Sequence, residues 1–239
     1  MAVRIKVVHH APLEDPYRVH MCAPGWPFGM IVLGGTNQGK TTSVLHMLLR
    51  MLHFHFLYVF AKNHETTPDY DELKELCRER EKKYGKCSLW DNKLDNVPKV
   101  SELDPKARNM FIFDDMTKVG DKEKRETIGD YFVAGRKGGA SVINIIHGLQ
   151  RAIDPTSRDQ ASHFLLFKKV NRKALKEIYE THCSADLSFK QFLEMYNECT
   201  RKQGDFLYID TKAPTIHERY RYQFHWFLDP TKLKNKLIQ

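Results

Sequence analysis

The chain has 239 residues, 41% of them hydrophobic, which is enough to bury one sizeable core but makes a second full domain unexpected. Its formal net charge of +8 favours polyanionic partners, with nucleic acid as the first candidate. The five cysteines are an odd set without CxxC spacing, which argues against a disulfide framework and a structural zinc site, and no apolar stretch resembles a signal peptide or a membrane span.

Continuous apolar runs predict strands that are buried on both faces. In chain order they cover residues 30–33, 56–60, 110–113, 141–146, 163–167 and 206–209. Such strands favour a largely parallel sheet with helices on both sides, which is an α/β fold. Aromatic and basic residues alternate over 219–227, a pattern that is typical of a half-buried edge strand and that also suits stacking with single-stranded nucleic acid.

Helical patterns occupy the gaps between the predicted strands. Helices are expected at 42–52 and 71–83, after Asp121, and after Ser188, where Gln191 completes a capping box. Their apolar stripes are interpreted as core. A pair of imidazoles at 53 and 55 lacks a third ligand at a convincing spacing, so it is interpreted as a surface feature.

The most specific motif lies between the first predicted strand and the first predicted helix. Strand, glycine-rich loop, Lys-Thr and helix follow one another in the order of a phosphate-binding loop. Backbone N–H groups of such a loop surround a phosphate, the lysine reaches the β- and γ-oxygens, and the threonine ligates Mg²⁺. The sequence therefore predicts binding of ATP and Mg²⁺ by Gly34, Gly35, Thr36, Asn37, Gln38, Gly39, Lys40, Thr41 and Thr42.

Two carboxylates follow the strand predicted at 110–113. Asp114 would lie at the carboxyl end of a buried strand, where a P-loop fold holds its Mg²⁺ together with Thr41. Asp115 lies one residue closer to the expected γ-phosphate and is the candidate for orienting and deprotonating the attacking water.

These motifs, followed by Gly135-Arg136-Lys137 and the strand from Ser141, resemble the genome-packaging ATPases of poxviruses, other large DNA viruses, virophages and Polinton-type elements, within the FtsK/HerA group. The resemblance covers residues 28–170. It implies a RecA-like P-loop NTPase, a three-layer sandwich with a mainly parallel central sheet. It also implies a homo-oligomeric ring that hydrolyses ATP and translocates double-stranded DNA, without sequence specificity, into a preformed capsid.

The same resemblance assigns two further roles. Arg136 matches the arginine of the family's Gly-Arg-His pattern, which is thought to reach the nucleotide of a neighbouring subunit, although Lys137 stands here in place of the histidine. Relatives end the following strand with a glutamine that senses the γ-phosphate. An ungapped count from Ser141 places His147 there, and Gln150 is the second candidate.

Three regions are expected: a lead-in segment at 1–28, the P-loop ATPase domain at 29–228, and a basic tail at 229–239. The protein is expected to be intracellular in the infected host cell, in the cytoplasm or nucleus at the site of viral assembly, or retained in the virion. A capsid or vertex protein is the expected docking partner, and no membrane span is expected. The basic loop residues, interpreted as DNA contacts or as solvated surface, are Arg136, Lys137, Lys168, Lys169, Arg172 and Lys173.

Two other function classes stay open. Many small-molecule kinases carry a P-loop at this chain length, although no arginine-rich lid is evident here. An ATP-binding scaffold for capsid assembly with negligible hydrolysis is the other, because Asp115 and His147 replace the usual glutamate and glutamine.

Overall fold

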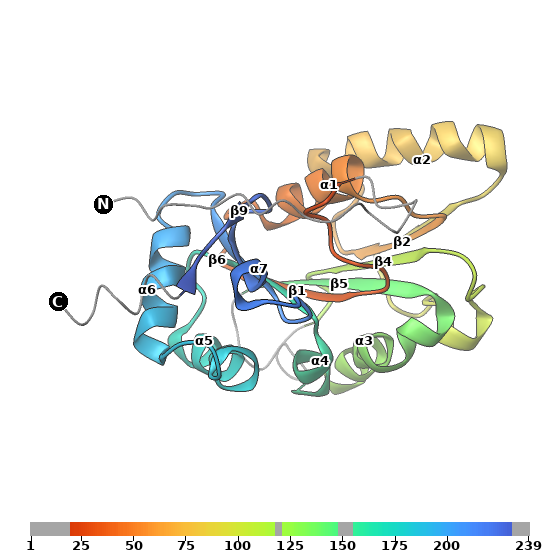
Figure 1. Ribbon diagram of the computed structural model, residues 1–239. Coiled ribbons are helices and arrows are strands. Elements are labelled where there is room, and N and C mark those ends of the chain that lie inside the picture. Colours follow the sequence, from red (N-terminus) through yellow and green to blue (C-terminus); the bar gives the residue numbers. More distant parts are fainter. Residues whose placement is uncertain (1–19, 118–120, 148–154, 231–239) are drawn as a thin grey trace.

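The computed structural model describes residues 20–117, 121–147 and 155–230 (Figure 1). Within them the chain forms one nine-stranded sheet with the order β3-β2-β4-β5-β1-β6-β7-β8-β9. The first six strands in this order are parallel, and β7, β8 and β9 continue the sheet in antiparallel fashion. The largely parallel sheet predicted from the apolar runs is therefore confirmed.

The strands lie close to their predicted positions. All six predicted runs form strands, and each observed strand matches its prediction to within one residue at either end. The segment at 219–227 forms two short edge strands instead of one, and β3 was not predicted. The bounds are β1 Gly29–Gly34, β2 Phe56–Ala61, β3 Ser88–Asp91, β4 Asn109–Asp114, β5 Ala140–His147, β6 His163–Phe167, β7 Phe206–Asp210, β8 Tyr220–Tyr222 and β9 Trp226–Phe227.

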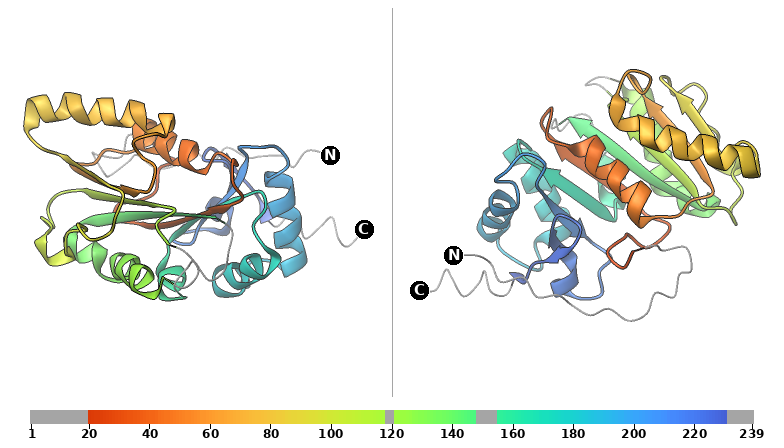
Figure 2. Two further views of the ribbon diagram at one scale, coloured as in Figure 1. Left: turned by 180° about the vertical axis from the view of Figure 1, so that it is seen from behind. Right: turned by 90° about the horizontal axis from the view of Figure 1, so that it is seen from above.

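Helices cover both faces of this sheet. In Figures 1 and 2, α1 and α2 lie on one face and α3, α4 and α5 lie on the other, which gives three layers. The α-helices are α1 Lys40–Met51, α2 Asp71–Tyr84, α3 Lys122–Ala134, α4 Pro155–Gln160, α5 Arg172–Ile178, α6 Phe189–Cys199 and α7 Ile216–Arg219. Shorter turns are η1 Pro68–Tyr70, η2 Val100–Glu102 and η3 Gly135–Gly138 as 3₁₀-helices and η5 Tyr179–Cys183 as a π-helix.

Two helix starts test the predicted caps. At α6 the Ser188 backbone N–H donates to Gln191 Oε1 at 2.8 Å, and the Gln191 N–H donates to Ser188 Oγ at 3.4 Å, so the predicted capping box is confirmed. At α3 the residue before the helix is Asp121, as predicted, but its side chain makes no capping hydrogen bond.

The central strands are buried on both faces because their successive side chains enter opposite cores. In β1, Ile31 and Leu33 pack in the cluster that contains α3 and α5 residues, whereas Met30 and Val32 pack in the cluster that contains α1 and α2 residues. This two-sided burial explains why the strand sequences are continuously apolar.

Among the described residues, no helix is both long and apolar enough to cross a bilayer. The predicted tail lysines Lys232, Lys234 and Lys236 and most of the predicted lead-in segment lie outside the described residues. The boundaries proposed at 28/29 and 228/229 stay predictions.

Candidate nucleotide-binding site

The sheet order brings the predicted site residues together at the carboxyl ends of the central strands, which are called the nucleotide-binding edge below. Strands β4, β5 and β1 are neighbours and run parallel, so their carboxyl ends lie side by side. In this register Gly34 is opposite His147, and Asp114 is opposite Ile145. Parallel α/β sheets place their ligand sites at this edge, outside the carboxyl ends of the strands.

The glycine-rich loop leaves β1 and returns directly as α1. Gly39 has a φ of 79°, a left-handed conformation that glycine adopts without strain, and α1 begins at the next residue. Neighbouring segments hold the loop in place: the Gly35 N–H donates to the Lys168 carbonyl at 2.9 Å, and Gln203 Nε2 donates to the Asn37 carbonyl at 2.7 Å. The loop therefore presents the N-terminus of α1 at the edge of the sheet, where backbone N–H groups favour an anion.

Lys40 is folded back onto the loop. Its ammonium group lies 2.7 Å from the Gly35 carbonyl, 3.2 Å from the Gly34 carbonyl and 3.0 Å from His147 Nδ1. Burial lowers the pKa of Lys40 to about 8, even though the carboxylates of Asp114 and Asp115 raise it. An incoming phosphate would supply the negative charge that this buried ammonium group lacks.

Asp114 and Thr41 face each other across the same edge. Thr41 Oγ1 donates to Asp114 Oδ2 at 3.0 Å, and the Tyr70 hydroxyl donates to the same oxygen at 2.7 Å. Burial raises the pKa of Asp114 and outweighs the hydrogen bonds from Tyr70 and Thr41, which lower it. A hydroxyl and a carboxylate are the hard oxygen ligands that Mg²⁺ takes beside substrate phosphates, so this pair fits the predicted metal.

A cavity of about 170 Å³ opens beside this pair. Asp115 lines it, and its backbone is held in a left-handed conformation, φ 53°, by an N–H bond to the Ile145 carbonyl at 3.0 Å. Residues from the carboxyl end of β2 and from η1, which the motifs did not point to, complete the wall. The lining consists of Thr41, Ala61, Lys62, Asn63, Thr67, Tyr70, Asp114, Asp115 and His147.

The remaining members of the predicted set lie nearby or elsewhere. Thr36 and Asn37 are exposed on the loop, and Gln38 is buried beneath it. Thr42 is exposed on α1, where its hydroxyl donates to Asp69 Oδ2 at 2.6 Å. Gln150 lies outside the described residues, so only His147 of the two sensor candidates has a place in the described site.

Arg136 lies near the amino ends of the parallel strands, at the end of the sheet opposite the P-loop. It is exposed on η3, which precedes the amino end of β5, whereas His147 ends the same strand. Eight residues of strand at ~3.3 Å each separate the two ends by roughly 23 Å. The turn itself is fixed, since Asn109 Nδ2 donates to the Gly138 carbonyl at 2.9 Å and Trp26 Nε1 donates to the Gly139 carbonyl at 3.1 Å. Arg136 therefore lies far from the nucleotide-binding edge of its own subunit.

Comparison with protein families matches residues 24–209 to the model described as "Poxvirus A32 protein". The match spans well over half of the chain. The chain belongs to the poxvirus A32 protein family. The resemblance inferred from the P-loop, the Asp114-Asp115 pair and Arg136 is thus confirmed at the level of the family. No curated protein matches the sequence.

Solved structures show the same fold as this A32-family chain. The genome packaging NTPase B204 from Sulfolobus turreted icosahedral virus 2, in complex with sulfate, aligns with a TM-score of 0.58 at 14% identity over 84% of this chain and 97% of B204. Its complex with ATP-gammaS aligns with a TM-score of 0.53 at 16% identity over 82% and 96%. VirB4 of Thermoanaerobacter pseudethanolicus aligns with a TM-score of 0.51 at 10% identity over 77% and 87%. The P-loop NTPase fold class is confirmed.

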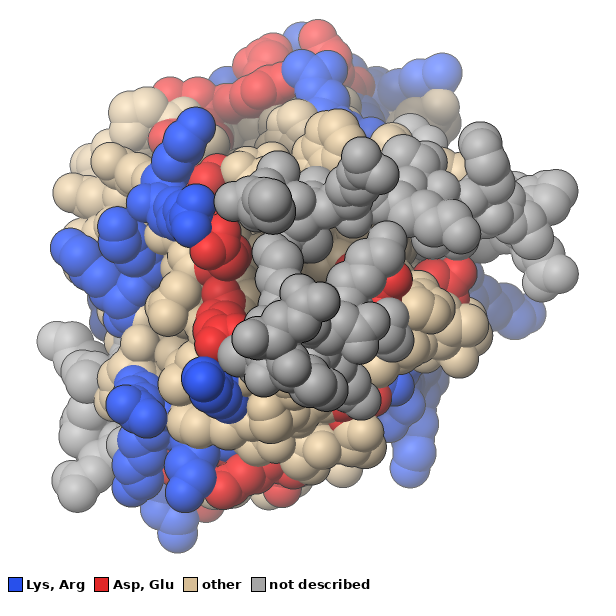
Figure 3. Space-filling view, turned by 60° about the vertical axis from the view of Figure 1, so that its left-hand side comes forward, with Lys and Arg blue, Asp and Glu red and all other residues tan. Residues whose placement is uncertain are grey.

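The two basic clusters of this A32-family chain lie at opposite ends of the parallel strands. Arg136 and Lys137 are exposed at the amino end of β5, whereas the cluster from Lys168 to Lys173 follows the carboxyl end of β6 and flanks the P-loop. In Figure 3, Lys and Arg side chains gather along the left edge of the face shown, and Asp and Glu side chains form a row beside them. The basic character is therefore divided between separate loops on a mixed surface.

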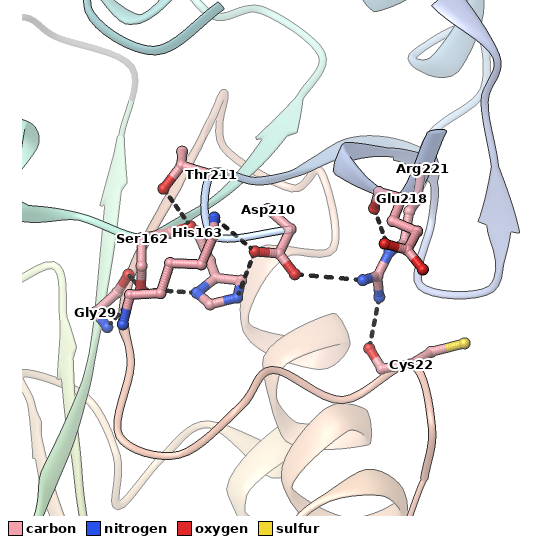
Figure 4. Close-up of polar contacts among 9 residues, drawn as sticks. Cys22, Gly29, Ser162, His163, Asp210, Thr211, Glu218 and Arg221 are labelled. Carbon is pink, nitrogen blue, oxygen red and sulfur yellow. Dashed lines mark hydrogen bonds and ion pairs between the residues drawn. The ribbon is translucent and has the colours of Figure 1, made fainter. Parts of the chain in front are cut away.

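A Ser-His-Asp arrangement elsewhere in the sheet has the composition of a catalytic triad, but its serine and histidine are buried and no substrate can reach them. Ser162 Oγ lies 2.8 Å from His163 Nδ1, and His163 Nε2 lies 3.3 Å from Asp210 Oδ1 (Figure 4). Ser162 is only 3% exposed, and its hydroxyl also lies 3.1 Å from the Gly29 carbonyl. Burial favours the neutral form of Asp210, but His163 and then Arg221 outweigh it and hold the pKa of this carboxyl below its usual value. The group ties the start of β1 to β6 and β7.

Proposed function

We propose that this protein is a Mg²⁺-dependent ATPase that translocates double-stranded DNA into a preformed capsid as a subunit of a homo-oligomeric ring. The observation that carries the proposal is the convergence of Lys40, Thr41, Asp114 and His147 at the carboxyl edge of a P-loop fold. Family membership and the fold shared with a genome packaging NTPase that binds ATP-gammaS support it.

In this proposal each side chain at the edge has one task. The loop N–H groups and Lys40 bind the β- and γ-phosphates, for which Lys40 exchanges its present bonds to the Gly34 and Gly35 carbonyls. Mg²⁺ held by Thr41 and Asp114 would neutralise charge on the phosphate oxygens. Asp115 orients and deprotonates the attacking water, and His147, released from Lys40, hydrogen-bonds the γ-phosphate.

Arg136 acts in this proposal on the nucleotide of a neighbouring subunit. Its place beyond the far end of β5 excludes contact with the phosphates bound to its own P-loop. An arginine that is exposed on a fixed turn is suited to enter a second subunit, where its charge stabilises the transferred phosphoryl group. A ring supplies every site with one such arginine.

Contact with DNA falls to exposed basic loops in this proposal. Phosphate contacts from lysine and arginine carry no sequence information, which suits a motor that moves any sequence. The cluster from Lys168 to Lys173 lies beside the P-loop, since the Lys168 carbonyl accepts the Gly35 N–H. If this loop moves when nucleotide binds, it would displace the DNA that it contacts.

The basic test is ATP hydrolysis by the purified chain with and without double-stranded DNA. We expect Mg²⁺-dependent phosphate release that DNA stimulates, and its loss in Lys40→Ala. Lys82→Ala, which removes an exposed lysine on α2 outside the cavity, is the matched control. Stable ATP-bound oligomers that release no phosphate would favour the assembly scaffold, and phosphate transfer to a nucleoside monophosphate would favour a kinase.

Mixing two inactive variants tests the placement of Arg136. Arg136→Ala keeps an intact P-loop, and Lys40→Ala keeps an intact arginine. In a random 1:1 ring roughly one quarter of the interfaces combine the two intact residues, so we expect about that share of wild-type activity to return if the sites act independently. Two active single variants, or a mixture that stays inactive although both variants assemble, would contradict action in trans.

A further inference from the structure

Three potential metal ligands meet outside the lining of the nucleotide-binding cavity. His20 and Cys22 precede β1, and His225 lies in the turn between β8 and β9. One ligand atom from each of the three residues lies within 4.8 Å of the other two. The spacing of cysteines in the sequence did not reveal this group, because its members come from opposite ends of the described chain.

The backbone around Cys22 is fixed. Its carbonyl accepts a hydrogen bond from Arg221 Nη1 at 2.8 Å, and Arg221 Nη2 in turn lies 3.4 Å from Asp210 Oδ2. Figure 4 shows this chain of contacts, with the Cys22 sulfur directed away from Asp210. Asp210 offsets part of the Arg221 charge, although Arg221 still acts on His225 as a positive charge.

The two imidazoles are arranged around the same point. The His20 and His225 rings meet edge to face with their centroids 5.0 Å apart. The Cys22 N–H donates to His20 Nδ1 at 3.0 Å, and this hydrogen bond must open for His20 to give a ring-nitrogen lone pair to a metal.

The distances are close to those of a bound metal. With Zn–N of about 2.0–2.1 Å and Zn–S of about 2.3 Å, the ligand atoms of a tetrahedral site lie roughly 3.3 to 3.6 Å apart. Contraction from at most 4.8 Å requires only a small rotation, and His225 is exposed and has room for it. Cys22 is buried at 4% exposure, so one side of the site is closed and the other opens to solvent.

We propose that His20, Cys22 and His225 bind a zinc ion, with a solvent molecule as the fourth ligand. Imidazole and thiolate together select zinc over the Mg²⁺ that suits the nucleotide-binding edge. Cys22 binds as the thiolate and releases its proton to solvent. The ion links the segment before β1 to the β8–β9 turn, and this role does not depend on the proposed motor function.

The test is titration of the purified full-length protein with Co²⁺ and then Zn²⁺ in excess Mg²⁺. We expect one equivalent of Co²⁺ to produce the near-ultraviolet thiolate-to-cobalt absorption and the strong visible bands of a tetrahedral site, and Zn²⁺ to abolish both. Oxygen ligands at the nucleotide-binding edge cannot give the thiolate absorption.

Matched variants locate the ion. Cys22→Ser should abolish the thiolate absorption, and His225→Gln should lower the affinity for Zn²⁺ by more than the roughly 10- to 100-fold that loss of an outer partner alone costs. Cys87→Ser, at another buried thiol, and His217→Gln, at another exposed imidazole, should leave both readouts unchanged. His225 is exposed, so its variant tests the site even where Cys22→Ser does not fold. Absence of the thiolate absorption in the wild type, or Zn²⁺ affinity unchanged in His225→Gln, would overturn the proposal.

Discussion

Tyr70 is the residue at the nucleotide-binding edge whose role is easiest to measure. Its hydroxyl donates to Asp114 Oδ2 at 2.7 Å, and the residue is 1% exposed. Burial, with the charge of Asp114 second, raises the pKa of Tyr70, so the hydroxyl keeps its proton and donates at every working pH. Tyr70→Phe removes this one donor while it keeps the ring that packs against Trp90.

The magnitude follows from the charge of the acceptor. A hydrogen bond to an ionised group contributes about 1.5–3 kcal/mol, and one to a neutral group about 0.5–1.5 kcal/mol. The two differ by about 1–1.5 kcal/mol, so loss of the bond raises the pKa of Asp114 further, by about one unit at 1.36 kcal/mol per unit. Tyr70→Phe should therefore lower the free energy of unfolding by about 1.5–3 kcal/mol where Asp114 is ionised and by less where it is protonated.

Two assays check this expectation. Urea unfolding across pH should give a loss of stability that grows as pH rises through the pKa of Asp114. The acid limb of kcat/KM for Mg²⁺-dependent ATP hydrolysis, which reports the free enzyme, should move to higher pH by about one unit. Tyr58→Phe, at a half-buried tyrosine on β2 outside the cavity, is the control. A loss of less than about 0.5 kcal/mol with an unshifted acid limb would refute the hydrogen bond.

Three further outcomes are expected. ATP affinity, measured by fluorescence with a labelled analogue, should weaken as pH rises past about 8, because the lowered pKa of Lys40 removes its charge there in the nucleotide-free protein, and constant affinity up to pH 10 would contradict this. His147→Ala should reduce kcat by about 10²- to 10³-fold while His147→Gln, which restores a hydrogen-bonding amide, retains more activity, and equal kcat in both would exclude the sensor role. Asp210→Asn should destabilise the protein by about 3–5 kcal/mol at neutral pH. Because the folded-state pKa of Asp210 is lowered, its contribution is complete above the ordinary carboxyl pKa and lost as pH falls through the lower folded value, so the variant should show a weaker acid dependence of unfolding.

The sequence predicted the parts of the site that lie on single strands. Continuous apolar runs marked β1, β4 and β5, and polar residues directly after such runs had to lie at the carboxyl edge. An ungapped count was enough to put His147 at the end of β5, where it lies opposite Gly34, because a strand without bulges keeps its register. Lys40, Thr41 and Asp114 therefore lie together as predicted, whereas their chemical roles stay predictions.

Other parts of the site depend on tertiary packing and left no local signal. Tyr70 reaches Asp114 from η1, ahead of a strongly charged helix whose apolar stripe indicates core and no binding site. Asn109, 1% exposed, fixes the turn that carries Arg136 although it precedes an ordinary apolar run. Strand β3 has four half-buried residues at the sheet edge, so neither a continuous nor a long alternating pattern could reveal it.

Strand β5 connects the two halves of the proposed mechanism. Its carboxyl end carries His147, which holds Lys40 in the structure and would be released by bound nucleotide, and its amino end follows the turn with Arg136. All its residues except His147 are buried, so close packing between the layers resists deformation of the strand. Nucleotide occupancy in one subunit could thus alter the arginine presented to the next. The measurement is a double-mutant cycle in kcat with the conservative variants His147→Gln and Arg136→Lys. Effects that multiply independently would contradict coupling, whereas an interaction free energy above about 0.5 kcal/mol would show that the two groups act together, at the shared phosphoryl group or through β5.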